Sequence, residues 1–164
     1  MPHTLAAIAF LFVMAAGLSV QADTLAQPLP APAQAKAGSR DAKVMAEVRA
    51  VLDAQVAAWN RGDIEGFMDG YWRSDETVFV SGDTVTHGWQ TVLDRYKKGY
   101  DSREKMGQLA FSDLDIKLLG KDTAVALGRW QLTRAKDTPH GRFTLIFRKT
   151  KAGWRIIHDH TSSA

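Results

Sequence analysis

The sequence contains no cysteine. This absence excludes disulfide bonds, thiolate metal ligands, a cysteine nucleophile and a lipidated amino-terminal cysteine. It is compatible with an exported protein, although it does not by itself indicate one. The fold must therefore be held together by a hydrophobic core and by hydrogen bonds.

Long runs of like charge are also absent. The chain has 21 Lys and Arg residues against 18 Asp and Glu residues, for a formal net charge of +3, and these charges are scattered along its length. No basic stripe is interleaved with aromatic residues, so we expect no nucleic-acid partner.

The motifs of several enzyme classes are missing as well. The sequence has no nucleophile elbow, no phosphate-binding loop and no dinucleotide-binding glycine pattern. It also has no Ser, His and Asp in the order of a hydrolase triad. We therefore expect no cofactor, and any activity must depend on another arrangement of side chains.

The amino-terminal segment has the pattern of a secretory signal. Residues 5–18 are apolar and uncharged, too few for a comfortable membrane span, and small residues follow at Val20 and Ala22. We predict a cleaved signal peptide over residues 1–22, and a periplasmic or secreted protein that does not contact a membrane after cleavage. Because no Lys or Arg precedes the apolar run, an uncleaved anchor is the alternative.

The next segment, residues 23–40, is rich in Ala, Pro and Gln. Such a composition cannot bury enough apolar surface to offset the entropy lost on ordering, so we predict a flexible linker. The remaining length has room for one domain with a hydrophobic core, which we predict over residues 41–162.

Apolar residues at helical spacing predict two helices at the start of this domain. The first opens near residues 39–41, which suit an N-cap, and carries apolar side chains as far as Trp59. Gly62 suits the C-cap of this helix, and Asp63 suits the N-cap of a shorter second helix.

Strand patterns dominate the rest of the domain. A hairpin with strands at residues 78–80 and 84–86 precedes a third helix over residues 90–100. Four longer strands follow, at residues 109–119, 124–134, 142–149 and 154–161. The apolar phase shifts between Phe111 and Leu114, which predicts a β-bulge that bends the sheet. The expected fold is α+β, with helices on one face of a curved antiparallel sheet wrapped around them.

Three motifs together resemble the nuclear-transport-factor-2-like superfamily and, within it, the SnoaL-like bacterial proteins. They are residues 56–63 (VAAWNRGD) with Phe67 and Tyr71, the pair His87-Gly88, and residues 153–162 (GWRIIHDHTS). The resemblance implies a cystatin-like cone, whose open end is a place where small ligands bind. It implies no single activity, because the superfold hosts isomerases, cyclases, dehydratases, hydrolases, transport factors and oligomerisation modules.

Ketosteroid isomerases of this superfamily use a tyrosine on the first helix and two aspartates on the sheet. Aligned through the Asn-x-Gly-Asp turn, this sequence has Gln55 in place of the tyrosine, and the aspartate places fall near Val80 and Leu145. That reaction needs a base for the proton and an acid for the enolate oxygen. The resemblance therefore does not imply this isomerase activity.

The end of the chain also resembles the association domain of calcium/calmodulin-dependent kinase type II. That domain ends in Trp, then His-x-His, then a small polar residue, as residues 154–161 do. Because it assembles a kinase and has a polar pocket, the resemblance implies assembly or binding as readily as catalysis.

Two histidines in the last strand are the main candidates for a site. With strand periodicity, Trp154, Ile156, His158 and His160 share one face and Asp159 lies on the other. Two such side chains stand about 6.5–7 Å apart, which suits a shared ligand, and either histidine is a candidate general base. The alternative is one imidazole hydrogen-bonded in the core and the other at a subunit interface or in solvent.

A metal ion shared by these histidines would need a third protein ligand. His87 and His140 are the candidates, but no ligand spacing signature supports either. We therefore predict no metal site.

Aromatic and basic residues complete the predicted ligand-binding set. Trp59, Tyr71, Tyr96 and Trp130 are candidates to line the cone, although aromatic residues at such spacing more often form a core. Arg142 lies in a predicted strand, where a guanidinium that faces the cone would select a carboxylate-bearing ligand. A solvated outer face is the alternative position for Arg142.

Three functions are consistent with these features. The first is binding of a small, mostly apolar molecule in the cone beside His158 and His160, by a homodimer formed through the outer sheet face. The second is an isomerase, dehydratase or hydrolase in which one of these histidines is the general base. The third is a homo-oligomeric assembly module without a ligand.

Overall fold

The structure, a computed structural model, describes residues 31–164, with side chains from Gly38 onward. The predicted signal peptide and residues 23–30 of the predicted linker lie outside these residues and stay predictions. Within the described part of the chain, no helix is both long enough and apolar enough to cross a bilayer.

The first helix, α1, runs from Ala31 to Asn60. It starts earlier than the expected residues 39–41, inside the predicted linker. Ala, Gln and Lys are good helix formers, and Pro32 is tolerated because it lies in the first turn, where its missing N–H has no intrahelical partner. The buried side chains of α1 recur at helical spacing, at Val44, Val48, Leu52, Gln55 and Trp59.

The turn after α1 forms as the sequence predicts. Gly62 has a φ of 89°, in the left-handed region that favours glycine. The Asp63 carboxylate accepts a hydrogen bond from the Gly66 N–H at 2.7 Å and so caps α2, Ile64–Met68. Tyr71, which follows α2, then forms an isolated parallel bridge with Ile156 of the last strand, β6 (Gly153–Thr161).

A hairpin and two helices follow. Strands β1 (Val78–Ser81) and β2 (Thr84–His87) are antiparallel, and helix α3 spans Trp89–Gly99, all close to the predicted positions. The short helix α4, Arg103–Met106, was not expected from the sequence. Its four residues are too few to show helical periodicity.

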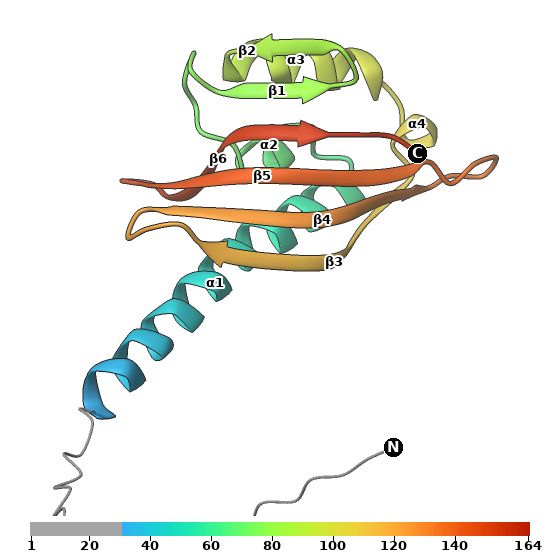
Figure 1. Cartoon of the computed structure of the whole chain (residues 1–164). Coiled ribbons are helices and arrows are strands. Elements are labelled where there is room, and N and C mark those ends of the chain that lie inside the picture. Colours follow the sequence, from blue (N-terminus) through green and yellow to red (C-terminus); the bar gives the residue numbers. More distant parts are fainter. Residues whose placement is uncertain (1–30) are drawn as a thin grey trace, which may run out of the picture. The chain divides into compact units, whose positions relative to one another are not determined.

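Four longer strands complete the sheet: β3 (Gln108–Leu118), β4 (Thr123–Thr133), β5 (His140–Thr150) and β6 (Gly153–Thr161). The six strands are ordered β2-β1-β6-β5-β4-β3. Neighbouring strands are antiparallel except β1 and β6, which are parallel, so the sheet is mixed (Figure 1). This arrangement joins the hairpin to the free edge of the last strand.

Two register shifts bend the sheet. The shift between Ser112 and Asp115 in β3 confirms the predicted bulge, and Asp113 has a φ of 52° there. A second shift lies in β6, where Ile146 pairs with His158 but Phe147 pairs with Ile156. Ile157 is the extra residue at this point.

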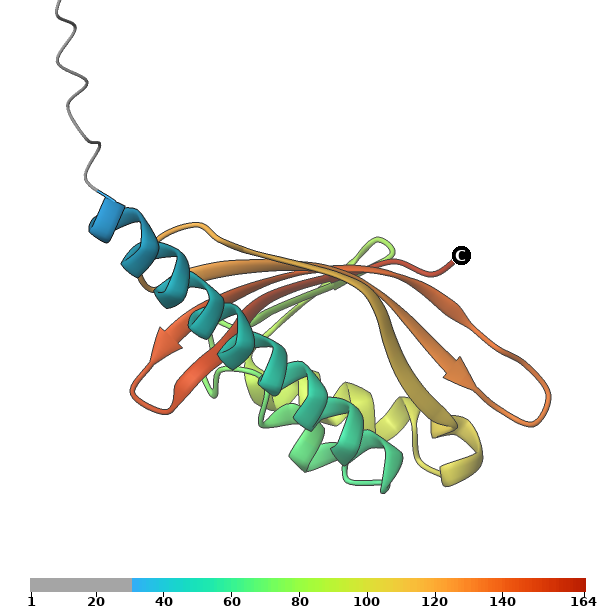
Figure 2. The same cartoon turned by 90° about the horizontal axis from the view of Figure 1, so that it is seen from below.

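The helices cover one face of the curved sheet, and the opposite face carries no helix (Figure 2). The buried core lies between the sheet and the helices and includes Phe67, Met68, Val92, Phe147 and Ile156. This arrangement confirms the predicted α+β fold with a curved sheet around helices. The sheet departs from the predicted antiparallel pattern only in the parallel pair β1 and β6.

Candidate functional site

A cavity of about 400 Å³ opens between the concave face of the sheet and helices α1, α2 and α3. Its wall is mainly aromatic and aliphatic, with a few polar side chains among them. The apolar lining comprises Trp59, Phe67, Tyr71, Phe79, Tyr96, Tyr100, Leu109, Phe111, Trp130, Leu132, Phe143 and Leu145. Such a mostly apolar hollow with few polar groups is typical of small-molecule sites.

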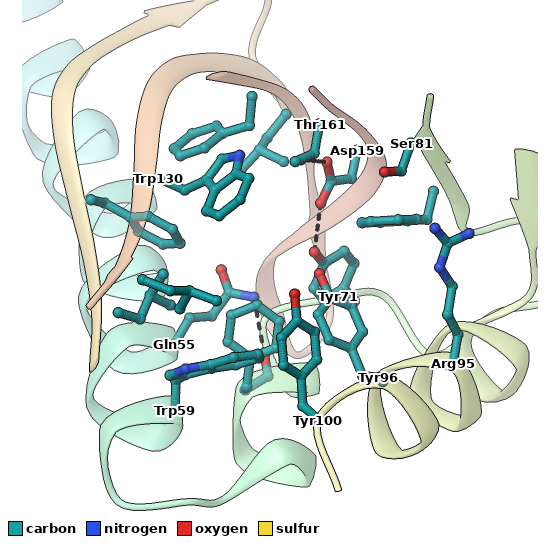
Figure 3. A pocket seen from close by; sticks show the side chains of 18 of the residues that line it. Gln55, Trp59, Tyr71, Ser81, Arg95, Tyr96, Tyr100, Trp130, Asp159 and Thr161 are labelled. Atoms are coloured by element: carbon teal, nitrogen blue, oxygen red, sulfur yellow. Dashed lines mark hydrogen bonds between the residues drawn. The ribbon is translucent and has the colours of Figure 1, made fainter. Parts of the chain in front are cut away.

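A buried carboxylate lies in the wall of this cavity (Figure 3). Asp159 is only 3% exposed, and its Oδ2 accepts a 2.6 Å hydrogen bond from the Tyr71 hydroxyl. Its Oδ1 accepts a second bond of 2.6 Å from the Thr161 hydroxyl. Both carboxylate oxygens therefore have protein donors, and the arrangement fixes the orientation of the group.

Burial dominates the electrostatics of Asp159. Removal from water raises its pKa to about 6, against the lowering effects of the Thr161 and Tyr71 hydrogen bonds and the charge of His160. Burial also raises the pKa of Tyr71 well above its ordinary value, and the nearby Asp159 charge raises it further. Tyr71 is therefore a neutral donor at ordinary pH, while Asp159 titrates close to neutrality.

Two more tyrosines join Trp59 in an aromatic wall. Trp59 packs against Tyr100 with ring centroids 4.7 Å apart and against Tyr96 at 6.1 Å. Burial is the largest cause of the raised pKa of both tyrosines. The Trp59 indole N–H donates to the Met106 carbonyl at 3.1 Å, which holds the ring against the cavity.

Gln55 contributes a polar group from α1 to the same space. It is 2% exposed, and its amide nitrogen donates to the Phe67 carbonyl at 3.0 Å. The amide oxygen is directed into the cavity (Figure 3). Gln55 therefore fixes α2 against α1 and also offers an acceptor to a bound molecule.

Two arginines lie among the more exposed lining residues. Arg95 on α3 is exposed, and Arg134 after β4 is half-buried. Asp159 and Tyr71 are buried, and Thr161 is half-buried. The cavity lining thus carries two basic groups that are more exposed than its carboxylate.

Four of the predicted ligand-binding residues line this cavity: Trp59, Tyr71, Tyr96 and Trp130. Their contact with a ligand stays a prediction. Trp130 is held by a 2.9 Å hydrogen bond from its indole N–H to the Ser162 carbonyl. The stripe of aromatic residues in the sequence is thus both core and cavity wall.

The predicted orientation of His158 and His160 is wrong. Neither histidine lines the cavity, His160 is exposed and His158 is half-buried beside its strand partners Val78 and Ile146. The extra residue Ile157 in the β6 bulge reverses the alternation, so Asp159 takes the inward position. Within the described residues, no three His, Asp or Glu side chains gather in a metal-binding cluster.

The expectation that Arg142 faces the cone is also wrong. Its strand neighbour Phe143 lines the cavity, whereas Arg142 points to the outer face and forms a 3.0 Å ion pair with Asp113. Asp113 belongs to the β3 bulge, so the bend that curls the sheet also supplies the partner of Arg142. This is the solvated alternative considered for that residue.

Sequence reasoning missed Asp159, Gln55, Arg95 and Arg134. Arg134 has the same strand parity as Trp130 and Leu132, so alternation along β4 was a usable signal for it. Gln55 lies one helical turn before Trp59, which is a similar signal. Asp159 had no such signal, because the bulge that turns it inward is not marked by Gly or Pro.

A curved sheet around helices, with an apolar cavity between them, defines a class of small cone-shaped proteins to which this chain belongs. Residues 48–164 match the SnoaL-like domain, and the chain is a member of that family. Among curated proteins, none matches the chain.

Solved structures give the same result. An NTF-2 like protein of unknown function from Shewanella oneidensis MR-1 is 40% identical, with 71% of this chain and 96% of that chain covered and a TM-score of 0.68. A nuclear transport factor 2-like superfamily protein from Salmonella enterica serovar Typhimurium LT2 is 20% identical, with 74% and 92% covered and a TM-score of 0.61. A domain of unknown function with a cystatin-like fold from Nostoc punctiforme PCC 73102 is 20% identical, with 71% and 75% covered and a TM-score of 0.60. The last two likenesses concern the fold alone.

Proposed function

We propose that this protein binds a small, mostly apolar molecule in the cavity, with a polar group of that molecule directed at Asp159 and Tyr71. The observation that carries the proposal is the cavity of about 400 Å³, whose aromatic wall surrounds a buried, hydrogen-bonded carboxyl. Apolar walls supply affinity, and a few fixed polar groups supply orientation.

A blocked cavity provides the test. Ser81 lines the cavity from β1 and is half-buried, so Ser81→Trp should fill the space with an indole. Val85 lies outside the cavity on β2 and is 55% exposed, so Val85→Trp is the matched control. A panel of small apolar alcohols, amides and acids is screened by thermal shift and calorimetry.

A compound that binds only the folded state stabilises it by about 2.7 kcal/mol when its concentration is about 100 times Kd. We expect such compounds to raise the Tm of the original protein and of Val85→Trp. The Tm of Ser81→Trp should not change when they are added. Equal stabilisation of all three proteins would place binding elsewhere and contradict the proposal.

Catalysis of proton transfer is a second candidate function, favoured by the pKa of Asp159. A carboxyl with a pKa of about 6 accepts and releases protons readily near neutral pH, as a general base or acid requires. Asp159 takes the role that the sequence assigned to a histidine. The reaction classes are those already considered: isomerisation, dehydration or hydrolysis.

Asp159→Asn should lower kcat by about a hundredfold or more for any substrate that is turned over, because the amide cannot accept the proton. With Asp159 as the base, the rate should rise with pH through an apparent pKa near 6. His160→Asn, in a residue outside the cavity, is the control. Loss of rate in His160→Asn with unchanged turnover in Asp159→Asn would reverse the assignment.

We further propose that a second copy of the chain packs on the sheet face that carries no helix. Leu127 on this face is 45% exposed, and the half-buried pair Val125 and Ile146 lies beside it in the ladder. Apolar side chains on an uncovered sheet face favour association. The corresponding prediction belongs to the sheet as an element and is argued below.

A further inference from the structure

The cavity lining holds groups of both charges. Asp159, hydrogen-bonded to Tyr71, is buried, whereas Arg134 is half-buried and Arg95 is exposed. A ligand in the cavity can therefore contact a guanidinium as well as the pair formed by Asp159 and Tyr71. The two arginines bear on the class of ligand that the proposed function requires.

Arg134 has an unused donor in the structure. Its Nε is buried and has no hydrogen-bond partner among the described residues. The rest of the guanidinium is only loosely paired, with Nη1 3.6 Å from an Asp137 carboxylate oxygen. Because Nε is buried, a ligand in the cavity would meet the guanidinium through Nη1 and Nη2.

Arg95 lines the cavity from helix α3. Its guanidinium lies over the Phe79 ring, 5.0 Å from the centroid, and donates to the Thr86 hydroxyl at 3.1 Å. Within the described residues, no carboxylate lies within ion-pair distance of Arg95. The Arg134 guanidinium lies 6.0 Å from the centroid of the Tyr100 ring, which also lines the cavity.

We propose that the ligand is an amphipathic carboxylate, whose carboxylate is received by Arg134 with support from Arg95 and whose apolar body lies against the aromatic wall. The polar group directed at Asp159 and Tyr71 is then a second group of the same ligand, separate from its carboxylate. A planar carboxylate offers two acceptors to the Nη1 and Nη2 donors of the guanidinium. The apolar body would fill the space between Trp59, Phe111 and Trp130. This inference rests on the proposed cavity-binding function and specifies its ligand class.

The test uses matched probes that differ only in the head group. The probes are 3-phenylpropanoate and octanoate, each with its primary amide and its alcohol, titrated calorimetrically into the full mature chain. The variants are Arg134→Gln and Arg134→Lys. Arg129→Gln is the matched control, because Arg129 lies on β4, the strand that Arg134 follows, and outside the cavity.

We expect each carboxylate to bind at least about tenfold more tightly than its amide or alcohol, since a charge-assisted pair is stronger than a neutral hydrogen bond. Arg134→Gln should remove about tenfold or more of the carboxylate affinity and leave alcohol affinity within about twofold. Arg134→Lys should retain part of the carboxylate affinity, because the positive charge remains, whereas the two parallel N–H donors of the guanidinium are lost. Arg129→Gln should change nothing.

The outcomes separate this inference from the proposed function. If the alcohols and amides bind as tightly as the acids and Arg134→Gln has no effect, cavity binding stands and the carboxylate assignment is overturned. If none of the probes binds at millimolar concentration, both are overturned. Unchanged alcohol binding in Arg134→Gln shows that the variant is folded, and loss of binding for every head group would assign Arg134 a structural role and overturn the inference.

Discussion

A buried carboxyl, that of Asp159, lines the cavity. Asp159 is held by Tyr71 and Thr161 at 2.6 Å each, and both donors belong to elements that the fold fixes. Burial raises its pKa from an ordinary value of 3.8 to about 6. A group with a raised folded-state pKa binds its proton more tightly in the folded than in the unfolded chain, so its protonated form favours folding.

This raised pKa predicts how stability changes with pH. The contribution of Asp159 should be fully present below pH 3.8 and be lost as pH rises through about 6. A shift of this size corresponds to about 3 kcal/mol. The free energy of unfolding of the original protein, minus that of Asp159→Asn, should therefore fall by about 3 kcal/mol between about pH 3 and pH 7.

Chemical denaturation of both proteins across that pH range measures this difference. Taking the difference removes the effects of the other titrating groups, which both proteins share. A difference that is flat, or that rises with pH, would mean that the Asp159 carboxyl is solvated or strongly ion-paired in the folded chain.

At the scale of elements, the strand β6 shows where sequence reasoning succeeds and where it stops. Its bounds were predicted to within a residue, because Trp154 and Ile156 alternate with polar positions. The faces on which the side chains of its second half lie were not predicted, because Ile157 is a β-branched residue that gives no sign of a bulge. Because of this one extra residue, Asp159 faces the cavity and His158 and His160 do not.

The bulge in β3 was predictable for the opposite reason. There the apolar phase itself shifts between Phe111 and Leu114, so the pattern shows the irregularity. In β6 the apolar residues end at Ile157, and the polar residues that follow carry no information about which face they occupy. Periodicity identifies a bulge only where apolar residues lie on both sides of it.

The sheet as an element also carries the prediction about assembly. If the face without helices packs against a second copy, Leu127→Asp should place a charge in that interface and give a monomer. Leu119 is 62% exposed and lies after β3 in the turn, so Leu119→Asp is the matched control. Light scattering at micromolar concentration should show dimers for the original protein and for Leu119→Asp.

A monomeric original protein at that concentration would contradict this prediction, and so would a Leu127→Asp variant that remains dimeric. The cavity opens on the other face of the sheet, so binding and association can be measured independently.

At the scale of the molecule, the fold followed from element order and motif spacing, and the site did not. Helices, hairpin and four long strands were placed because each has a periodic apolar face that must be buried. The cavity lining depends on which side chains leave space unfilled between these faces. That property belongs to the packed structure, and the sequence signals only some of its members, such as Trp59 and Trp130.

A crystal structure of the protein with a compound from the thermal-shift screen tests the central claim most directly. The account predicts electron density for the compound in the cavity against Trp59 and Tyr96, with a polar atom within hydrogen-bond distance of the Asp159 carboxyl or the Tyr71 hydroxyl. Density only outside the cavity, or side chains that close the cavity in the crystal, would contradict it.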